Sequence, residues 1–127
     1  MGERTPTTPV RAGAVTEIRR GRIDDPAAAP AVGERHEVLA HLGRTRIEQI
    51  LSGAPEGPRS FIGEDDEWVV VLAGAARLEL GGVASAMEAG DWVLIPAGSP
   101  HVLHETAPGT LWLAVHVPPS GDPLRER

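Results

Sequence analysis

The chain has 127 residues, of which 41% are hydrophobic and 24% are charged, a mixture typical of one globular domain with a hydrophobic core. Its formal net charge of −6 argues against a nucleic-acid partner, because phosphate recognition needs a clustered lysine and arginine surface. Cysteine is absent, so a metal ion would need nitrogen and oxygen ligands, and no apolar run is long enough to cross a membrane.

The first 13 residues, MGERTPTTPVRAG, carry threonine, proline, glycine and charge without a hydrophobic period. Such a segment buries too little apolar surface to offset the entropy of ordering, so a flexible arm is predicted. It also lacks the apolar centre of a signal peptide, and the sequence therefore predicts a cytoplasmic protein.

Residues 14–44 are predicted to hold a strand and one short helix. The stretch AVTEIRRGRI is compatible with a short strand, and DDPAAAPAVG after it is a connection broken by proline. In ERHEVLAHLG the apolar residues fall at helical spacing, and Gly43 stands where a left-handed C-cap is needed, so a helix is predicted over residues 34–42. The apolar residues concerned are Val38, Leu39 and Leu42.

From residue 45 to residue 117 the pattern changes to short strands separated by glycine and proline, which is typical of an all-β sandwich or barrel. In AARLELGG, apolar residues alternate with charged ones, and Gly81-Gly82 is predicted to be the two-residue loop of a hairpin. Residues 118–127 are predicted to be a C-terminal tail. The predicted strands are TRIEQILS (45–52), EWVVVLAG (67–74), AARLEL (75–80), VASAME (83–88), DWVLIPAG (91–98) and TLWLAVHV (110–117).

Three of these strands are apolar on both faces, in the runs WVVVL, WVLI and LWLAV. A two-layer sandwich buries only one face of each strand, so the other face needs its own cover. A second copy of the chain would supply that cover, and a homodimer is therefore predicted. The alternative is that the N-terminal arm or helix lies over this face.

The segment GDWVLIPAGSPH, from Gly90 to His101, has the spacing G-x5-P-x-G-x2-H. Upstream, Glu67 is followed after six residues by Gly74, and the 15 residues between Gly74 and Gly90 hold one hairpin. In an all-β pattern, these spacings together resemble the two sequence motifs of the cupin family. The resemblance covers residues 45–117 and implies a small single-domain cupin, an RmlC-like jelly-roll barrel or double-stranded β-helix with a pocket in its interior.

The resemblance also implies a metal centre, in which two histidines and a glutamate of the first motif and the histidine of the second hold iron, manganese, nickel, zinc or copper. This chain departs from that pattern. The positions of the histidine pair fall within SFIG, residues 60–63, and no histidine occurs from residue 42 to residue 100. Glu105 replaces the asparagine that closes the second motif. Of the four implied ligands, Glu67 and His101 remain.

A divalent metal would need further ligands, because tight binding takes three or more protein groups and Glu67 with His101 supplies two. On a strand, an offset of four residues returns Glu105 to the face of His101. His116 would also look into the barrel if its face of the strand is the inner one. The predicted metal ligands are therefore Glu67 and His101, completed by Glu105, His116 or solvent. The predicted ligand pocket consists of Phe61, Glu67, His101, Trp112 and His116.

The remaining histidines fit surface positions. His36 and His41 lie in the predicted helix, where a solvated histidine is the ordinary case. The odd offset of His104 from His101 points its side chain to the opposite face of a strand. His116 is likewise compatible with a surface or interface position.

Three functions remain open from the sequence. The favoured one is a protein that binds a small organic ligand with weak or no metal, as a sensor, a carrier or an isomerase in which His101 is the general base. The second is a metal-dependent enzyme of oxygenase or isomerase type that uses Glu67 and His101. The third is a non-catalytic dimeric module with a vestigial pocket. We expect His101 to come within ligand reach of Glu67, whichever of the first two holds.

Overall fold

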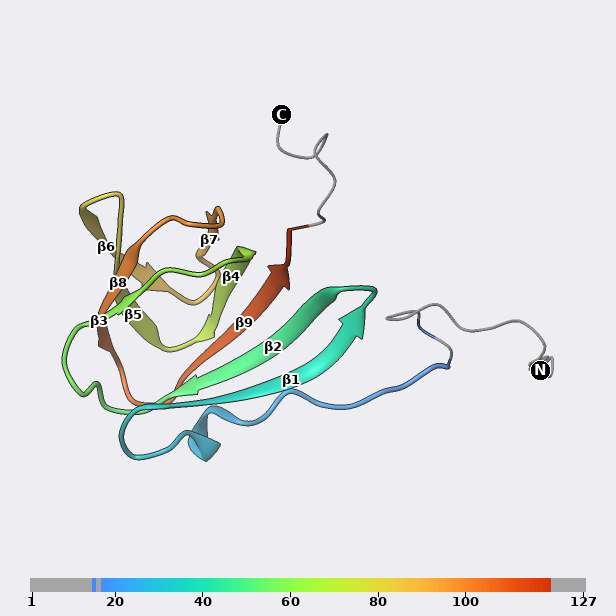
Figure 1. The fold of residues 1–127 in the computed structure, drawn as a ribbon. Helices are drawn as coiled ribbons and strands as arrows, with labels where there is room; N and C mark the ends of the chain where they lie inside the picture. Colours follow the sequence, from blue (N-terminus) through green and yellow to red (C-terminus); the bar gives the residue numbers. More distant parts are fainter. Residues whose placement is uncertain (1–14, 16, 120–127) are drawn as a thin grey trace.

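The computed structural model describes residue 15 and residues 17–119 of the chain (Figure 1). The predicted arm over residues 1–13 lies outside the described residues, as does the tail from residue 120 onward. The described part is almost entirely β-structure, so the all-β prediction is confirmed. The strands are β1 (Glu34–Leu42), β2 (Thr45–Ser52), β3 (Arg59–Phe61), β4 (Asp66–Ala73), β5 (Ala75–Leu80), β6 (Val83–Glu88), β7 (Trp92–Ile95), β8 (His101–Thr106) and β9 (Thr110–Val117).

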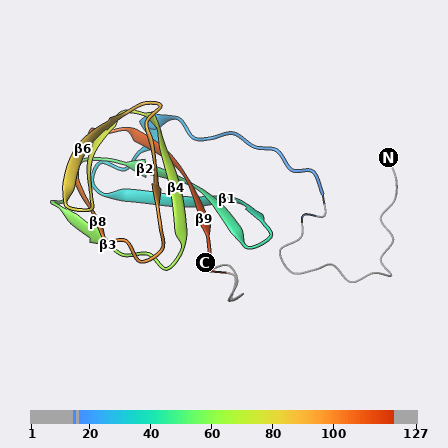
Figure 2. The same cartoon turned by 90° about the horizontal axis from the view of Figure 1, so that it is seen from above.

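The strands form two antiparallel sheets. One sheet has five strands in the order β1-β2-β9-β4-β7, and the other has four in the order β3-β8-β5-β6. The chain passes repeatedly from one sheet to the other, so that strands distant in sequence become neighbours. In both views the hairpin of β1 and β2 extends away from the four-stranded sheet (Figures 1 and 2). This topology is that of a jelly roll.

The predicted strands between residues 45 and 117 are confirmed, with ends that differ by a few residues. The hairpin of β5 and β6 is confirmed as well, with Leu80 paired to Val83. Its loop residues have φ angles of 58° at Gly81 and 80° at Gly82, which a residue with a β-carbon adopts only at a cost. Glycine is therefore needed at both positions of this loop.

The predicted helix over residues 34–42 is wrong, because this segment is the edge strand β1. Its register against β2 shifts between Val38 and Ala40, so Leu39 is the extra residue of a β-bulge. A bulge moves the alternation by one residue, and the apolar positions then imitate a helical spacing. Gly43 does take the left-handed conformation, with φ 61°, but in the hairpin turn to β2.

The strand predicted over residues 14–23 is also wrong in its described part, since residues 17–23 form no strand. Instead, an irregular segment runs along β1 and β2 and includes a short 3-10 turn at Pro26–Ala28. The side chain of Gln49 donates to Asp24 at 2.8 Å and accepts from the Asp24 backbone N–H at 3.0 Å. These bonds satisfy an amide that is 2% exposed and fix the segment on the outer face of the sheet.

The hydrophobic core lies between the two sheets. Strands β2, β4, β5, β6, β7 and β9 contribute inward-facing residues to it, and the indole of Trp112 is the largest of their side chains. Within the described residues no helix is long and apolar enough to span a membrane. The buried core residues are Ile50, Val69, Val71, Ala76, Leu78, Met87, Ile95, Trp112 and Ala114.

Candidate functional site

A cavity of about 450 Å³ opens between the two sheets, above the hydrophobic core. Its deeper wall is apolar, because the strands that enclose it alternate and turn their aliphatic side chains inward. Polar and charged side chains line the rest. The apolar lining residues are Ile50, Phe61, Ile62, Val69, Leu78, Ile95, Leu103 and Trp112.

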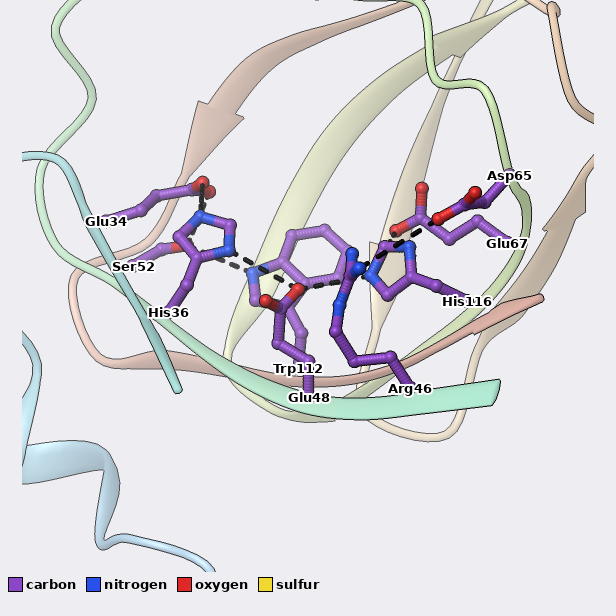
Figure 3. Close-up of polar contacts among 9 residues, drawn as sticks. All are labelled: Glu34, His36, Arg46, Glu48, Ser52, Asp65, Glu67, Trp112 and His116. Carbon is purple, nitrogen blue, oxygen red and sulfur yellow. Dashed lines mark hydrogen bonds and ion pairs between the residues drawn. The ribbon is translucent and has the colours of Figure 1, made fainter. Parts of the chain in front are cut away.

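The five-stranded sheet contributes a line of alternating carboxylates and imidazoles to this cavity, which we call the polar row (Figure 3). The members come from four adjacent strands, β1, β2, β9 and β4, and each faces inward. They lie side by side for three reasons of register: Glu67 pairs directly with His116, Glu34 and His36 are two residues apart on β1, and the other neighbours are diagonal across adjacent strands. The polar row consists of Glu34, His36, Glu48, His116 and Glu67.

Short contacts connect the polar row from end to end. His36 Nε2 lies 3.1 Å from Glu34 Oε1, and its Nδ1 lies 3.5 Å from Glu48 Oε1. The same Glu48 oxygen accepts from His116 Nε2 at 3.1 Å. The Nε2 of His116 also lies 4.0 Å from Glu67 Oε2. Glu48 therefore stands between two imidazoles, and its carboxylate is largely buried.

The core holds one end of the polar row in place. The indole N–H of Trp112 donates to Ser52 Oγ at 3.0 Å, and this hydroxyl donates to Glu34 Oε2 at 3.0 Å (Figure 3). Ser52 is fully buried, so the pair of bonds satisfies both its donor and its acceptor capacity. Glu34 is thereby fixed although it belongs to an edge strand.

Two ionisable groups of the polar row have shifted pKa values. Burial alone would raise the pKa of Glu34, but hydrogen bonds from His36 and Ser52, with the charges of His36 and Arg59, lower it below its ordinary value. The hydrogen bond to Glu34 raises the pKa of His36, more than burial lowers it, and the charge of Glu48 raises it further. The pair therefore favours an ionised carboxylate beside a protonated imidazole.

The four-stranded sheet contributes His101 from β8 and Phe61 from β3, which are paired in register. Their rings stack with centroids 5.4 Å apart and an interplanar angle of 19°. His101 Nδ1 lies 3.2 Å from the carbonyl oxygen of Ser99. A carbonyl oxygen only accepts, so Nδ1 carries the proton and the lone pair of the neutral ring is on Nε2. The turn before β8 thus sets both the tautomer and the orientation of this histidine.

All five residues of the predicted ligand pocket line the cavity. Glu67 and His116 belong to the polar row, Phe61 and His101 lie on the opposite sheet, and Trp112 is in the core between them. Their side chains thus come from four strands of the two sheets and meet around one space.

Glu105 does not reach the cavity, and the prediction that it shares the face of His101 is wrong. Its side chain is exposed and outside the cavity lining. In β8, Leu103 pairs with Leu78 and Glu105 with Arg77, which leaves His104 as the extra residue of a bulge. The bulge reverses the alternation after Leu103, so that Thr106 is buried in place of Glu105.

The sequence missed three members of the polar row. Glu34 and His36 were assigned to a helix, and only the pairing of β1 with β2 brings them into the cavity. Glu48 was an ordinary charged position in a predicted strand, but it is only 8% exposed. In TRIEQILS, Glu48 lies on the same strand face as Ile50 and Ser52, and this spacing of two residues was the one sequence signal that placed Glu48 on the inner face.

The residues present do not fit the metal centre implied by the resemblance. Phe61, within the segment that replaces the histidine pair, covers one face of the His101 ring. Glu67 contacts His116, and it forms no hydrogen bond or ion pair with His101 in the described part of the chain. Nor do the described residues contain any group of three or more histidine, aspartate or glutamate side chains arranged to hold a metal ion. The expectation that His101 and Glu67 share a metal has no support in this arrangement.

Comparison with known proteins gives the family. The model of the cupin domain family matches residues 46–116, which is more than half of the chain. A Ralstonia eutropha JMP134 protein, provisionally named a mannose-6-phosphate isomerase, is 32% identical with a TM-score of 0.64, and the match covers 78% of this chain and 100% of that one. No curated protein matches the chain significantly.

Two more distant structures share the fold. KdgF from a Halomonas species is 20% identical with a TM-score of 0.62, and the match covers 68% of this chain and 82% of that one. An RmlC-like cupin from Shewanella frigidimarina NCIMB 400 is 14% identical with a TM-score of 0.61, and the match covers 81% of this chain and 96% of that one. With the jelly roll and its lined cavity, these matches show that the chain belongs to the cupin family, whose members bind small ligands or metal ions.

Proposed function

We propose that the barrel cavity binds a small organic molecule without a metal centre of the kind usual in the family. The observation that carries this proposal is the cavity itself. Its volume of about 450 Å³ lies within the range of about 300–1,000 Å³ found for small-molecule sites. It combines an apolar wall with a few polar groups on fixed positions, which is the composition that binds and orients a small ligand.

A sugar phosphate, the kind of substrate in the provisional name of the Ralstonia eutropha relative, does not fit this cavity well. A sugar phosphate needs cationic groups for its phosphate, preferably an arginine fork. Arg46 is the only arginine or lysine among the described lining residues, and its Nη1 already lies 3.9 Å from Asp65 Oδ2. The cavity therefore offers a bound phosphate little charge compensation.

Acid–base catalysis of isomerase type is a second candidate, favoured by the fixed tautomer of His101. Its Nε2 is left as a proton acceptor by the bond from Nδ1 to Ser99, and stacking on Phe61 holds the ring. A neutral imidazole so held can remove a proton from a bound substrate. Incubating bound compounds in D2O and following them by NMR tests this: deuterium should replace a carbon-bound proton with the wild type and not with His101→Ala.

Ligand binding itself is tested by thermal-shift screening of a metabolite library, followed by calorimetry on the compounds that stabilise the protein. We expect His101→Ala to weaken their binding by about tenfold or more, because it removes a lining group and the stacking partner of Phe61. Glu105→Gln is the matched control, since this exposed residue lies on the same strand outside the cavity. Circular dichroism should show both variants folded.

Two outcomes would contradict the proposal. Equal affinities for the wild type and His101→Ala would place the binding site elsewhere. Stoichiometric metal in protein purified without a histidine tag, with metal lost from Glu67→Gln, would favour the metal-dependent alternative.

A further inference from the structure

The charges around the cavity are strongly unequal. Five carboxylates line it, against Arg46 and three histidines. Even with every one of these histidines protonated, five negative charges would face four positive ones. Arg46 is moreover engaged by Asp65, at 3.9 Å. The carboxylates are those of Glu34, Glu48, Glu64, Asp65 and Glu67.

This negative charge lies beside apolar walls. A wall of low dielectric weakens solvent screening and strengthens the field of the carboxylates inside the cavity. The lowered pKa of Glu34 keeps that group ionised at neutral pH. An anion entering the cavity would be repelled, whereas a cation would be attracted.

Among the cavity carboxylates that accept no hydrogen bond in the described part of the chain, Glu67 has the least exposed side chain. Its side chain is 21% exposed, and it accepts no hydrogen bond within the described part of the chain. His116 Nε2 lies 4.0 Å from Glu67 Oε2, and its N–H is already donated to Glu48. A half-buried carboxylate is stabilised by donors, so this position suits a ligand that brings N–H groups.

The opposite side of the cavity suits the carbon skeleton of such a ligand. Phe61 and Leu78, from the four-stranded sheet, offer aromatic and aliphatic surface there. Trp112 and Ile95, from the same sheet as Glu67, extend the apolar wall. An aromatic face near a cation adds a favourable electrostatic contribution. The cavity volume of about 450 Å³ leaves room for an organic group attached to the charged head.

Building on the proposed function, we infer that the ligand is a small organic cation, an amine whose ammonium group binds at Glu67 and whose apolar part lies against Phe61 and Trp112. Trp112 belongs to the sheet of Glu67, whereas the charge at Glu67 and the aromatic face of Phe61 are on opposite sheets. A ligand that reaches both must carry the amine at one end.

Three probes of similar shape and different charge test this inference by calorimetry on the full chain: phenethylamine, phenethyl alcohol and hydrocinnamate. Phenethylamine should bind about tenfold tighter than the alcohol, which is about 1.4 kcal/mol, and hydrocinnamate should bind weakest. Raising the salt concentration should weaken the binding of the amine and leave the binding of the alcohol unchanged. Glu67→Gln should remove most of the preference for the amine. Glu105→Gln should retain it.

The outcomes separate this inference from the proposed function. If the alcohol binds as tightly as the amine, and both are weakened by His101→Ala, the cavity binds ligands but the inferred charge is wrong. Preferential binding of hydrocinnamate, or no binding of any probe at millimolar concentration, also overturns the inference. Should Glu67→Gln fail to fold, Glu64→Gln is the second variant, and it should lower the preference to a smaller extent because Glu64 is exposed at the cavity mouth. Failure of the library screen would instead count against the cavity as a binding site.

Discussion

Gly74, the last residue of the first motif, shows how one position can be set by packing. Its φ is 90°, and a β-carbon built on it would lie 2.5 Å from Thr110 Oγ1. Thr110 cannot retreat, because it is fully buried and its hydroxyl donates to the Ala107 carbonyl at 2.6 Å. The hydroxyl also accepts from the Ala75 N–H at 3.2 Å. The glycine is thus required by the fold and has no chemical role in the cavity.

Replacing Gly74 by alanine should therefore destabilise the protein without touching the cavity lining. We expect Gly74→Ala to lower the free energy of unfolding by at least about 2 kcal/mol, from backbone strain and the clash with Thr110. Urea denaturation of the wild type and the variant measures this difference in the free energy of unfolding. Gly63→Ala is the control, because its β-carbon would meet nothing closer than 4.0 Å and its change should stay within about 0.5 kcal/mol. Equal stabilities of the two variants would show that Thr110 can move.

The Glu34–His36 pair should make stability depend on pH. The pKa of Glu34 is lowered from its ordinary value of 4.5, so its contribution is present above that value and is lost as the pH falls through the folded-state pKa. The pKa of His36 is raised from 6.5, so its contribution is present below that value and is lost as the pH rises through the folded-state pKa. The stability difference between wild type and His36→Gln should therefore be largest between pH 4.5 and pH 6.5 and smaller on either side.

Urea denaturation across this pH range provides the measurement. His41→Gln is the matched control, since His41 is exposed on the same strand and forms no hydrogen bond or ion pair in the described part of the chain. Its difference from wild type should not vary with pH in this way. A flat profile for His36→Gln would mean that the pair adds no pH-dependent stability.

At the scale of elements, the sequence predicted the strands of the barrel but missed the features that break a regular pattern. The strands from 45 to 52 and from 110 to 117 were found because their apolar and turn residues follow the usual rules. Strand β1 was mistaken for a helix because of its bulge. Three-residue β3 is too short to show alternation, and the bulge in β8 misplaced Glu105. Motif spacing identified Glu67 and His101, whereas Glu34, His36 and Glu48 of the polar row were missed because their positions depend on how the strands pair.

Strand β3 and the residues after it also decide whether this barrel can hold a metal. The segment 60–63 contains no imidazole, and all four of its residues line the cavity near His101 and Glu67. A β-carbon built on Gly63 would meet no atom closer than 4.0 Å, so the backbone there leaves room for a side chain to begin. This barrel therefore lacks metal-binding side chains in segment 60–63, although it has space for them.

Restoring the histidine pair should create a metal site. We expect Phe61→His/Gly63→His to bind zinc or nickel stoichiometrically at micromolar metal, because two imidazoles would join His101 and Glu67 around one cavity. Wild type should bind less under the same conditions, by elemental analysis after dialysis. Phe61→Leu/Gly63→Ala controls for the loss of stacking. No gain in metal would show that His101 and Glu67 cannot converge on one ion.

At the scale of the whole molecule, the outer face of the five-stranded sheet is unusually apolar. Within the described residues, the N-terminal segment covers this face along β1 and β2, where Asp24 binds Gln49. Over β4 and β7 large apolar side chains are exposed: the ring centroids of Trp68 and Trp92 lie 5.9 Å apart, and Trp92 and Leu94 are 58% and 62% exposed. The described part of the N-terminal segment therefore covers one part of the face, while the predicted arm over residues 1–13 lies outside the described residues.

We propose that a second copy of the chain covers this remaining face. Apart from Asp66 at the start of β4, the outward residues of β4 and β7 are apolar, and an apolar face of this kind can pair with its own copy across a two-fold axis. A stable interface buries about 800 Å² on each partner, mostly through such exposed aromatic and aliphatic groups. Leu94→Glu would place a charge in its centre and should convert a dimer to a monomer in sedimentation equilibrium. Val83→Glu, at a residue 66% exposed on the other sheet, should remain dimeric. A wild type that sediments as a monomer at every concentration would leave the apolar face without this partner.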